Sequence, residues 1–96
     1  MSAIKHDFKE ARNCMIWAES AEFFVQALRF VTDELGFEAV NDYKVSQTGN
    51  GNDKETQFFQ LLRHPKGNVD VQATYALINA FRNKASRGNV SSIWLG

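Results

Sequence analysis

The chain has 96 residues, 44% of them hydrophobic and 12% aromatic, and its 11 basic and 11 acidic side chains give a net charge of zero. This length allows one small domain that buries about two thirds of its unfolded surface, and the composition excludes an intrinsically disordered chain. No apolar run can span a membrane, the first ten residues lack the apolar stretch of a secretory signal, and the single cysteine excludes an internal disulfide. We therefore expect one domain, residues 1–96, in the reducing cytoplasm.

Two helices are predicted in the first 36 residues. The first begins at a capping box formed by Asp7 and Glu10, and the second begins at Ser20 and ends at Gly36, which suits the position after a helix. Apolar residues recur at helical spacing at Phe8, Ala11, Met15 and Ala18, and again at Phe24, Leu28, Val31 and Leu35. The two registers do not join, so we expect either a break near Glu19 or one long helix whose halves face different neighbours.

The middle of the chain is predicted to hold an ambiguous segment, a loop and a third helix. Residues 37–45 fit a short strand or the start of a helix, and residues 46–53 are typical of a flexible loop. Asn52 or Asp53 can cap a helix that ends near Arg63, because the residue before a proline avoids the α region. The apolar face of this helix is supplied by Phe58, Phe59, Leu61 and Leu62.

A turn and a last helix complete the prediction. The segment RHPKG contains the only proline, and Pro65 and Gly67 suit a type I turn. Residues 69–75 alternate as a strand would, yet their alanines and those that follow favour a helix that ends at Gly88. These elements predict a mostly α fold, a compact bundle of three or four helices with a short extended segment at 37–45 as an option. The tail, residues 89–96, is apolar.

No group of residues indicates catalysis. His6, Asp7 and Glu10 could approach a metal, but further ligands at defined spacing are missing, so capping is the preferred interpretation. Cys14 has no base beside it in the sequence and is expected to be a small buried apolar group. No nucleophile elbow or phosphate-binding glycine motif occurs. We expect no enzyme, no cofactor and no metal.

Basic side chains gather in the second half of the chain. Residues 1–48 hold five basic and eight acidic side chains, a net charge of −3, and residues 49–96 hold six and three, a net charge of +3. These basic groups could stabilise helix ends or contact nucleic-acid phosphates weakly. The candidate phosphate contacts are Arg63, Lys66, Arg82, Lys84 and Arg87.

Two segments are candidates for binding. Apolar residues at a chain end pack on their own domain or on a partner, and tryptophan is enriched at binding hot spots. The candidate partner-binding residues are Ile93, Trp94, Leu95, Trp17 and Tyr43. The second segment, His64, Pro65, Lys66 and Gly67, is by default a plain turn. Alternatively, because an X–Pro bond isomerises slowly, it is a conformational switch on which a prolyl isomerase acts.

In its small size, its lack of catalytic residues and its expected cytoplasmic character, the chain resembles the small host-takeover accessory proteins of tailed phages, such as the anti-RecBCD modulators of lambdoid phages. Its RHPKG segment and its aromatic helical stretches are compatible with this resemblance. The resemblance implies an inhibitor or modulator of a host DNA-processing nuclease. We therefore expect a non-enzymatic protein-interaction module that binds and modulates a partner enzyme, without membrane association. Two alternatives stay open: a nucleic-acid-binding module that uses the basic C-terminal half, and a homodimeric structural protein with the apolar stripe of residues 23–35 as its seam.

Overall fold

The computed structural model describes residues 9–48, 55–85 and 91–96 of the chain. Its strands are β1 (Glu10–Ala11), β2 (Asn13–Ala18), β3 (Glu38–Ala39), β4 (Lys44–Thr48), β5 (Glu55–Arg63), β6 (Val69–Asp70) and β7 (Ser91–Leu95). Its helical segments are α1 (Ala21–Arg29), the π-helix η1 (Phe30–Glu34) that continues it, and α2 (Val71–Lys84).

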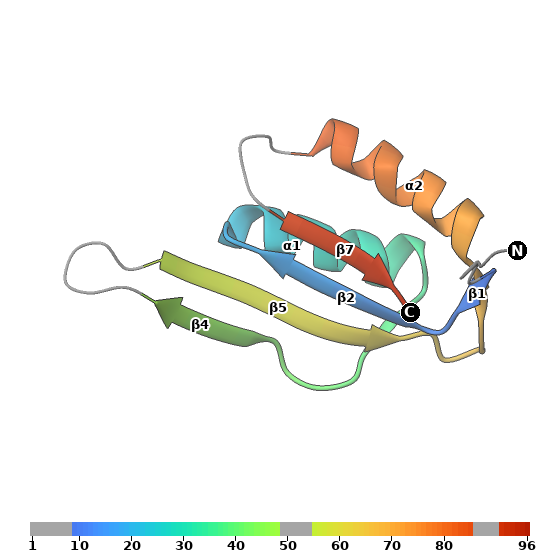
Figure 1. The fold of residues 1–96 in the computed structure, drawn as a ribbon, viewed down its shortest axis with the longest axis horizontal. Coiled ribbons are helices and arrows are strands. Elements are labelled where there is room, and N and C mark those ends of the chain that lie inside the picture. Colours follow the sequence, from blue (N-terminus) through green and yellow to red (C-terminus); the bar gives the residue numbers. More distant parts are fainter. Residues whose placement is uncertain (1–8, 49–54, 86–90) are drawn as a thin grey trace, which may run out of the picture.

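Five of these strands form one antiparallel sheet (Figure 1). β5 and β2 lie at its centre, β7 pairs with the outer side of β2, and β3 and β4 pair with successive parts of β5. β1 and β6 form a separate two-stranded ribbon. The order β2, α1, β4, β5, α2, β7 is that of the split β-α-β arrangement, in which each helix connects two strands that have one other strand between them.

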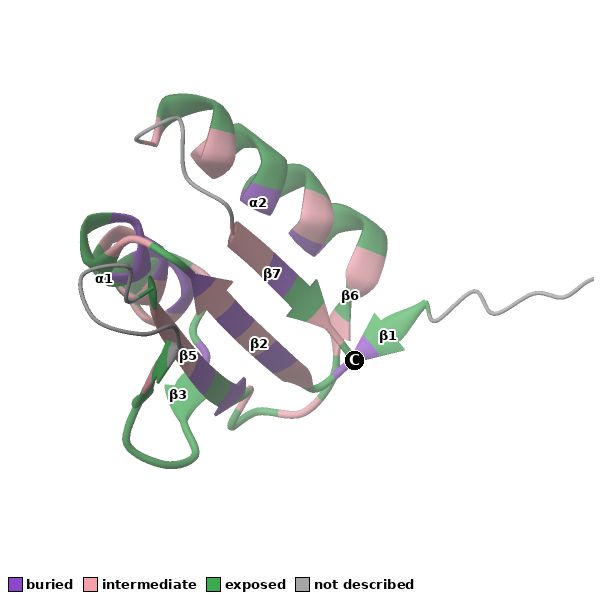
Figure 2. Ribbon diagram, turned by 60° about the vertical axis from the view of Figure 1, so that its left-hand side comes forward, coloured by how far each residue is buried: buried purple, intermediate pink, exposed green. Residues whose placement is uncertain are grey.

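Both helices cover the same face of the sheet. The Phe24 ring of α1 stacks on Phe58 of β5 with ring centroids 5.7 Å apart, and Phe81 of α2 stacks on Phe30 at 4.6 Å. The burial colours alternate along β2, because successive side chains of a strand point to opposite faces (Figure 2). The core between sheet and helices consists of Cys14, Ile16, Ala18, Phe23, Phe24, Ala27, Phe30, Val31, Phe37, Leu62, Ile78 and Ile93.

Short polar residues set the starts of both helices. The Ser20 hydroxyl oxygen accepts a hydrogen bond from the Phe23 N–H at 3.2 Å, and an Asp70 carboxylate oxygen accepts one from the Ala73 N–H at 2.7 Å. Each bond satisfies a backbone donor that has no partner inside the helix. The helix predicted from Ser20 is therefore present, and the last predicted helix is present as α2 with Asp70 as its cap.

The first helical region ends with a wide turn and a glycine. The Leu35 N–H donates to the Phe30 carbonyl five residues earlier at 3.2 Å, which is the π-helical bond, and Gly36 then adopts a φ of +83°. This left-handed conformation strains any residue with a Cβ, so the predicted role of Gly36 after the helix fits.

The prediction of a mostly α helical bundle is wrong. Residues 13–18 form strand β2 instead of the first helix, and residues 55–63 form strand β5 instead of the third. Asp7 of the predicted capping box lies outside the described residues, and Glu10 begins strand β1 instead of a helix. The error has a physical cause in β5, where the doublets Phe58–Phe59 and Leu61–Leu62 imitate helical spacing. In the strand, each doublet sends one side chain to the covered face and one to the opposite face.

The structure also decides the predictions for three other segments, residues 37–45, 46–53 and 89–96. Residues 37–45 contain β3 and the beginning of β4, so the strand alternative holds there. β4 extends to Thr48 into the predicted loop at 46–53, and the rest of that loop lies outside the described residues. The C-terminal tail is an outer strand of the sheet over residues 91–95 and not a loose apolar end.

Candidate protein-binding face

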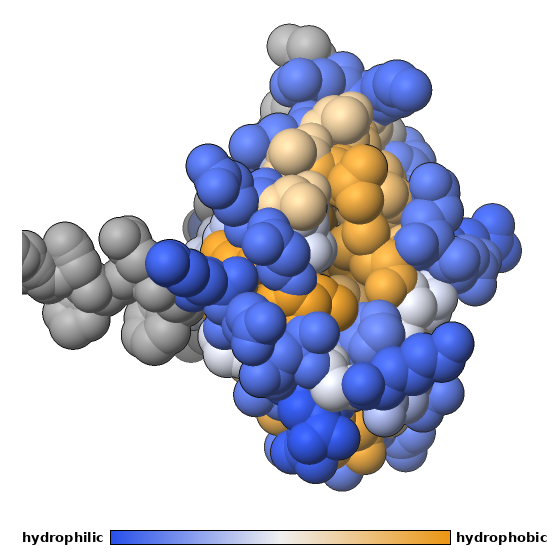
Figure 3. Space-filling view, turned by 90° about the vertical axis from the view of Figure 1, so that its right-hand side faces the viewer, coloured by the Kyte–Doolittle hydropathy of each residue, from blue (hydrophilic) through white to orange (hydrophobic). Residues whose placement is uncertain are grey.

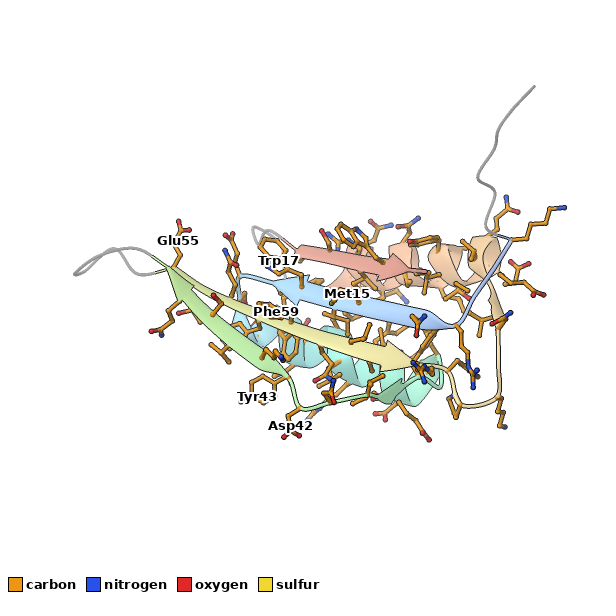
Figure 4. All side chains as sticks on the ribbon, turned by 60° about the horizontal axis from the view of Figure 1, so that its bottom comes forward. Met15, Trp17, Asp42, Tyr43, Glu55 and Phe59 are labelled. Carbon is orange, nitrogen blue, oxygen red and sulfur yellow. The ribbon has the colours of Figure 1, made fainter. Side chains whose placement is uncertain are left out.

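The face of the sheet turned away from α1 and α2, which we call the open face, carries large apolar side chains. Cross-strand partners project to the same side of a sheet. Trp17 faces Phe59 on one neighbouring strand and Ser92 on the other, while Met15 faces Trp94. Figure 4 shows Met15, Trp17 and Phe59 on this face with the helices behind the sheet. The open face is formed by Met15, Trp17, Phe59, Leu61, Ser92 and Trp94.

These side chains are accessible to solvent. Trp94 has 64% of its surface exposed and Leu61 has 37%, and the other large residues of the open face are half-buried by their neighbours. The chain has two tryptophans, Trp17 and Trp94, and both lie on this face. A contiguous exposed apolar surface of this kind is typical of an interaction site.

A hollow of about 380 Å³ lies in the open face, lined by Met15, Trp17, Phe59, Ser92 and Trp94. The pairing register of β2 and β7 explains why the hollow forms. Ser92 is the cross-strand neighbour of Trp17 on β7, and its small side chain leaves space among the larger ones. Among the described residues that line the hollow there is no charged side chain, no cysteine and no histidine. The hollow therefore suits an apolar side chain rather than a reaction centre.

Four charged side chains lie on the open side of the strands. Arg63 lies opposite Glu38 at one end of β5, Glu55 lies opposite Thr48 at the other end, and Lys44 of β4 lies opposite Phe59. By the alternation along the strands, all four project to the open side. Within the described strands of this sheet, the open side therefore carries two basic and two acidic side chains.

The outer edge of β7 is protected by α2. The Leu95 N–H donates to the Tyr75 hydroxyl at 2.9 Å, and Arg82 donates from Nη2 to the Ser91 carbonyl at 3.3 Å. These backbone groups are the ones that an added strand would use. The edge of β7 is thus engaged within the molecule, and Trp94 is held in a fixed strand with its side chain on the open face.

The five residues predicted to bind a partner lie in three different environments. Trp17 and Trp94 lie on the open face. Ile93 is buried in the core, and Leu95 is half-buried against it. Tyr43 is 55% exposed, but its ring lies 5.8 Å from the Phe24 ring, on the helix side of the sheet. The prediction grouped these residues by type, and the structure separates them.

The sequence reasoning missed Met15, Phe59, Leu61 and Ser92. Met15 and the Phe59–Leu61 pair were assigned to helix faces, where they would have faced the core. The signal that could have found them is the apolar character of both faces of the segments 13–18 and 57–63. A strand that is apolar on both sides must be covered on both sides or expose one of them.

The predicted switch segment forms a supported turn. The Gly67 N–H donates to the His64 carbonyl at 3.3 Å, and His64 Nδ1 accepts from the Lys66 N–H at 3.3 Å. The His64 ring packs edge-on against Phe37 with centroids 5.1 Å apart. The described residues contain no cis peptide bond, so the bond before Pro65 is trans. The sequence predicted that this turn would connect two helices. In the structure it connects β5 to β6 and α2.

The basic side chains do not form one patch. Arg63 and Lys66 lie before α2, whereas Lys84 lies at its other end, and 14 helical residues span about 21 Å. Arg82 is half-buried, with its guanidinium 5.5 Å from the centre of the Phe23 ring, so it packs within the fold. Arg87 lies outside the described residues.

Cys14 and the acidic residues give no sign of a reactive or metal centre. Cys14 lies in the core, and burial raises the pKa of its thiol to about 12, which disfavours the thiolate. Among the described residues, no three His, Cys, Asp or Glu side chains come close enough to hold a metal ion. His6 lies outside those residues.

Two further surfaces deserve comparison with the open face. The outer side of α2 carries an apolar strip in the upper part of Figure 3, formed by Ala73, Ala76, Leu77 and Ala80. A second hollow, of about 310 Å³, lies between α1–η1 and the end of α2. Phe30 and Phe81 line it together with side chains of both charges. Neither surface contains a tryptophan or as many large apolar side chains as the open face.

Comparison with known proteins leaves the site geometry as the basis for function. No protein-family model matches the chain, and no curated protein matches it. No described helix has both the length and the apolar character that a membrane span requires.

Proposed function

We propose that this protein works by binding a protein partner on the open face of its sheet and thereby changing what the partner does, without chemistry of its own. The observation that carries the proposal is Trp94, 64% exposed on a fixed strand beside an apolar hollow. Interface hot spots combine an aromatic anchor with a pocket in this way.

The open face can supply useful affinity. A tryptophan side chain offers up to about 250 Å² for burial, so covering the exposed part of Trp94 removes roughly 150 Å² from water. At about 25 cal/mol per Å², this contributes on the order of 4 kcal/mol before the cost of association. An apolar partner side chain in the hollow would add to this figure.

Two alternatives have less support. Aromatic side chains on a sheet can stack nucleotide bases, but phosphate contact needs an excess of positive charge, and the rim of the open face is neutral. A homodimer along the stripe of residues 23–35 has less support, because Phe23, Phe24, Phe30 and Val31 are buried beneath the chain's own sheet and α2. A protein partner at the open face fits the neutral rim and the apolar centre best.

The resemblance to tailed-phage accessory proteins makes a host DNA-processing nuclease the first partner to test. The purified chain is immobilised as wild type, as Trp94→Ala and as the matched control Leu77→Ala, and each is exposed to bacterial lysate and to the purified nuclease. Leu77 is a suitable control because it is 54% exposed on α2, away from the open face.

We expect the wild type and Leu77→Ala to retain the same protein. Trp94→Ala should bind it at least about 30-fold more weakly, which corresponds to a hot-spot residue worth about 2 kcal/mol. A titration with the retained protein, followed by tryptophan emission, checks that this protein binds at the open face, because both tryptophans lie there. Equal retention by Trp94→Ala, or an emission spectrum that the bound protein leaves unchanged, contradicts the proposal.

A further inference from the structure

We infer that, in the absence of a partner, the open face is covered by a second copy of this chain in a two-fold dimer, which must dissociate before a partner can bind. The inference rests on the proposed function, since it concerns the same face and gives its regulation. It adds that a second copy of the chain occupies this face in the purified protein. Three properties of the open face support a second copy: its area, its shape and its charge.

The area approaches that of a stable dimer. The five strands hold 27 residues, each covering about 3.3 Å by 4.8 Å, so the face measures about 430 Å² in projection, and its projecting side chains add to the surface that can be buried. Stable interfaces bury about 600–1,000 Å² on each partner. The apolar strip on α2 extends from residue 73 to residue 80, about 11 Å of helix, and is one helix wide, roughly 100 Å², which is too small. The sheet therefore offers a better self-association surface than the helix.

The shape is self-complementary. A two-fold interface brings one patch against the same patch, so that patch must contain both a projection and a recess. The open face has the projecting Trp94 and, directly beside it, the hollow above Ser92 and Met15. Two copies related by a two-fold axis can therefore place each Trp94 ring at the hollow of the other.

The charge permits close approach. The rim carries Lys44 and Arg63 against Glu38 and Glu55, and the whole chain has a net charge of zero. Two copies meeting at this face bring equal numbers of basic and acidic strand residues together, so they experience no net repulsion. A nucleic acid would meet equal attraction and repulsion at the same rim, so the charge favours a second copy over it.

The experiment measures mass and tryptophan emission over a wide range of protein concentration. Sedimentation or light scattering should give twice the chain mass of 10.9 kDa at high concentration and the single mass on dilution. On dilution over the same range, tryptophan emission should shift to longer wavelength, because Trp17 and Trp94 become exposed to solvent. Trp94→Ala, which removes the projection, and Ser92→Arg, which fills the hollow with a charge, should each raise the dissociation constant at least tenfold. Leu77→Ala should leave it unchanged, and circular dichroism checks that every variant is folded.

Three results would overturn the inference. The first is a wild type that stays monomeric with concentration-independent emission. The second is a dimer that survives both open-face substitutions or dissociates in Leu77→Ala. The third is binding of a single-stranded thymidine oligonucleotide that quenches both tryptophans in the monomer. A monomer that still captures a protein through Trp94 overturns this inference alone, whereas a dimer that captures none supports self-association and contradicts the proposed function.

Discussion

The covered and open faces of β2 differ in side-chain size more than in polarity. Cys14, Ile16 and Ala18 point beneath α1 and are fully buried, while Met15 and Trp17 point to the open side. The small side chains of Cys14 and Ala18 on the covered face allow the helix to approach the sheet closely. Larger residues on the other face occupy space that no described helix needs. The same strand thus packs into the core on one side and forms part of the proposed binding face on the other.

The open face differs from the core in how its side chains are held. Covered residues are fixed by close packing on all sides, so their contribution is to stability. Open-face residues pack only sideways, and their contribution should appear in binding. Substitutions on the two faces should therefore separate stability from recognition.

The largest effect is expected for Ile16→Ala compared with Met15→Ala. Ile16 is completely buried, and its truncation should lower the free energy of unfolding by about 2–5 kcal/mol through lost burial and a cavity. Met15 is half-buried by its neighbours and should cost clearly less. Urea denaturation followed by circular dichroism measures both. Equal losses at the two positions would remove the distinction between the faces.

A pH effect is expected from Cys14 on the covered face. Burial raises the pKa of its thiol from 9.0 to about 12, so above pH 9 the unfolded chain loses a proton that the folded chain retains. Stability from this group is present below pH 9 and declines as the pH rises toward 12, by at most about 1.4 kcal/mol per pH unit. The wild type should therefore lose more stability than Cys14→Ala between pH 8 and pH 10. Parallel losses in the two proteins would show that the thiol titrates alike in both states.

A smaller effect is expected at the protected edge of β7. Tyr75→Phe removes the hydroxyl that accepts the Leu95 N–H and should cost about 1 kcal/mol, because a partly buried donor loses its partner. Amide hydrogen exchange at Leu95 should accelerate in the variant. Unchanged exchange at that amide would indicate that α2 does not protect this edge.

The smallest effect on stability is expected for Trp94→Ala. An exposed side chain away from the core changes the free energy of unfolding by about 0.5 kcal/mol or less. Denaturation midpoints of this variant and the wild type should nearly coincide at concentrations where both are monomeric. A loss comparable with that of Ile16→Ala would mean that Trp94 belongs to the core, which would weaken the case for the open face.

The candidate site was only partly predictable. Trp94 and Trp17 were selected because exposed tryptophan often anchors partners. Ile93 and Leu95 were selected with them, although the strand turns both toward the core. Phe59 and Leu61 were placed on a helix, because their doublets with Phe58 and Leu62 fit helical spacing. A two-residue period is visible in a sequence only when the two faces of a strand differ in polarity, and here both are apolar.

The sequence by itself determined the elements that depend on nearby residues. Ser20 caps α1, Gly36 follows the helical region, and the Pro65–Gly67 turn forms, because their hydrogen bonds and dihedral angles involve residues a few positions away. Only the tertiary structure decided that the segments beginning at Asn13 and Glu55 are paired strands. The two segments pair with each other across 40 to 50 positions of the chain, so these hydrogen bonds and the two-sided environment of the strands exist only after the chain has folded.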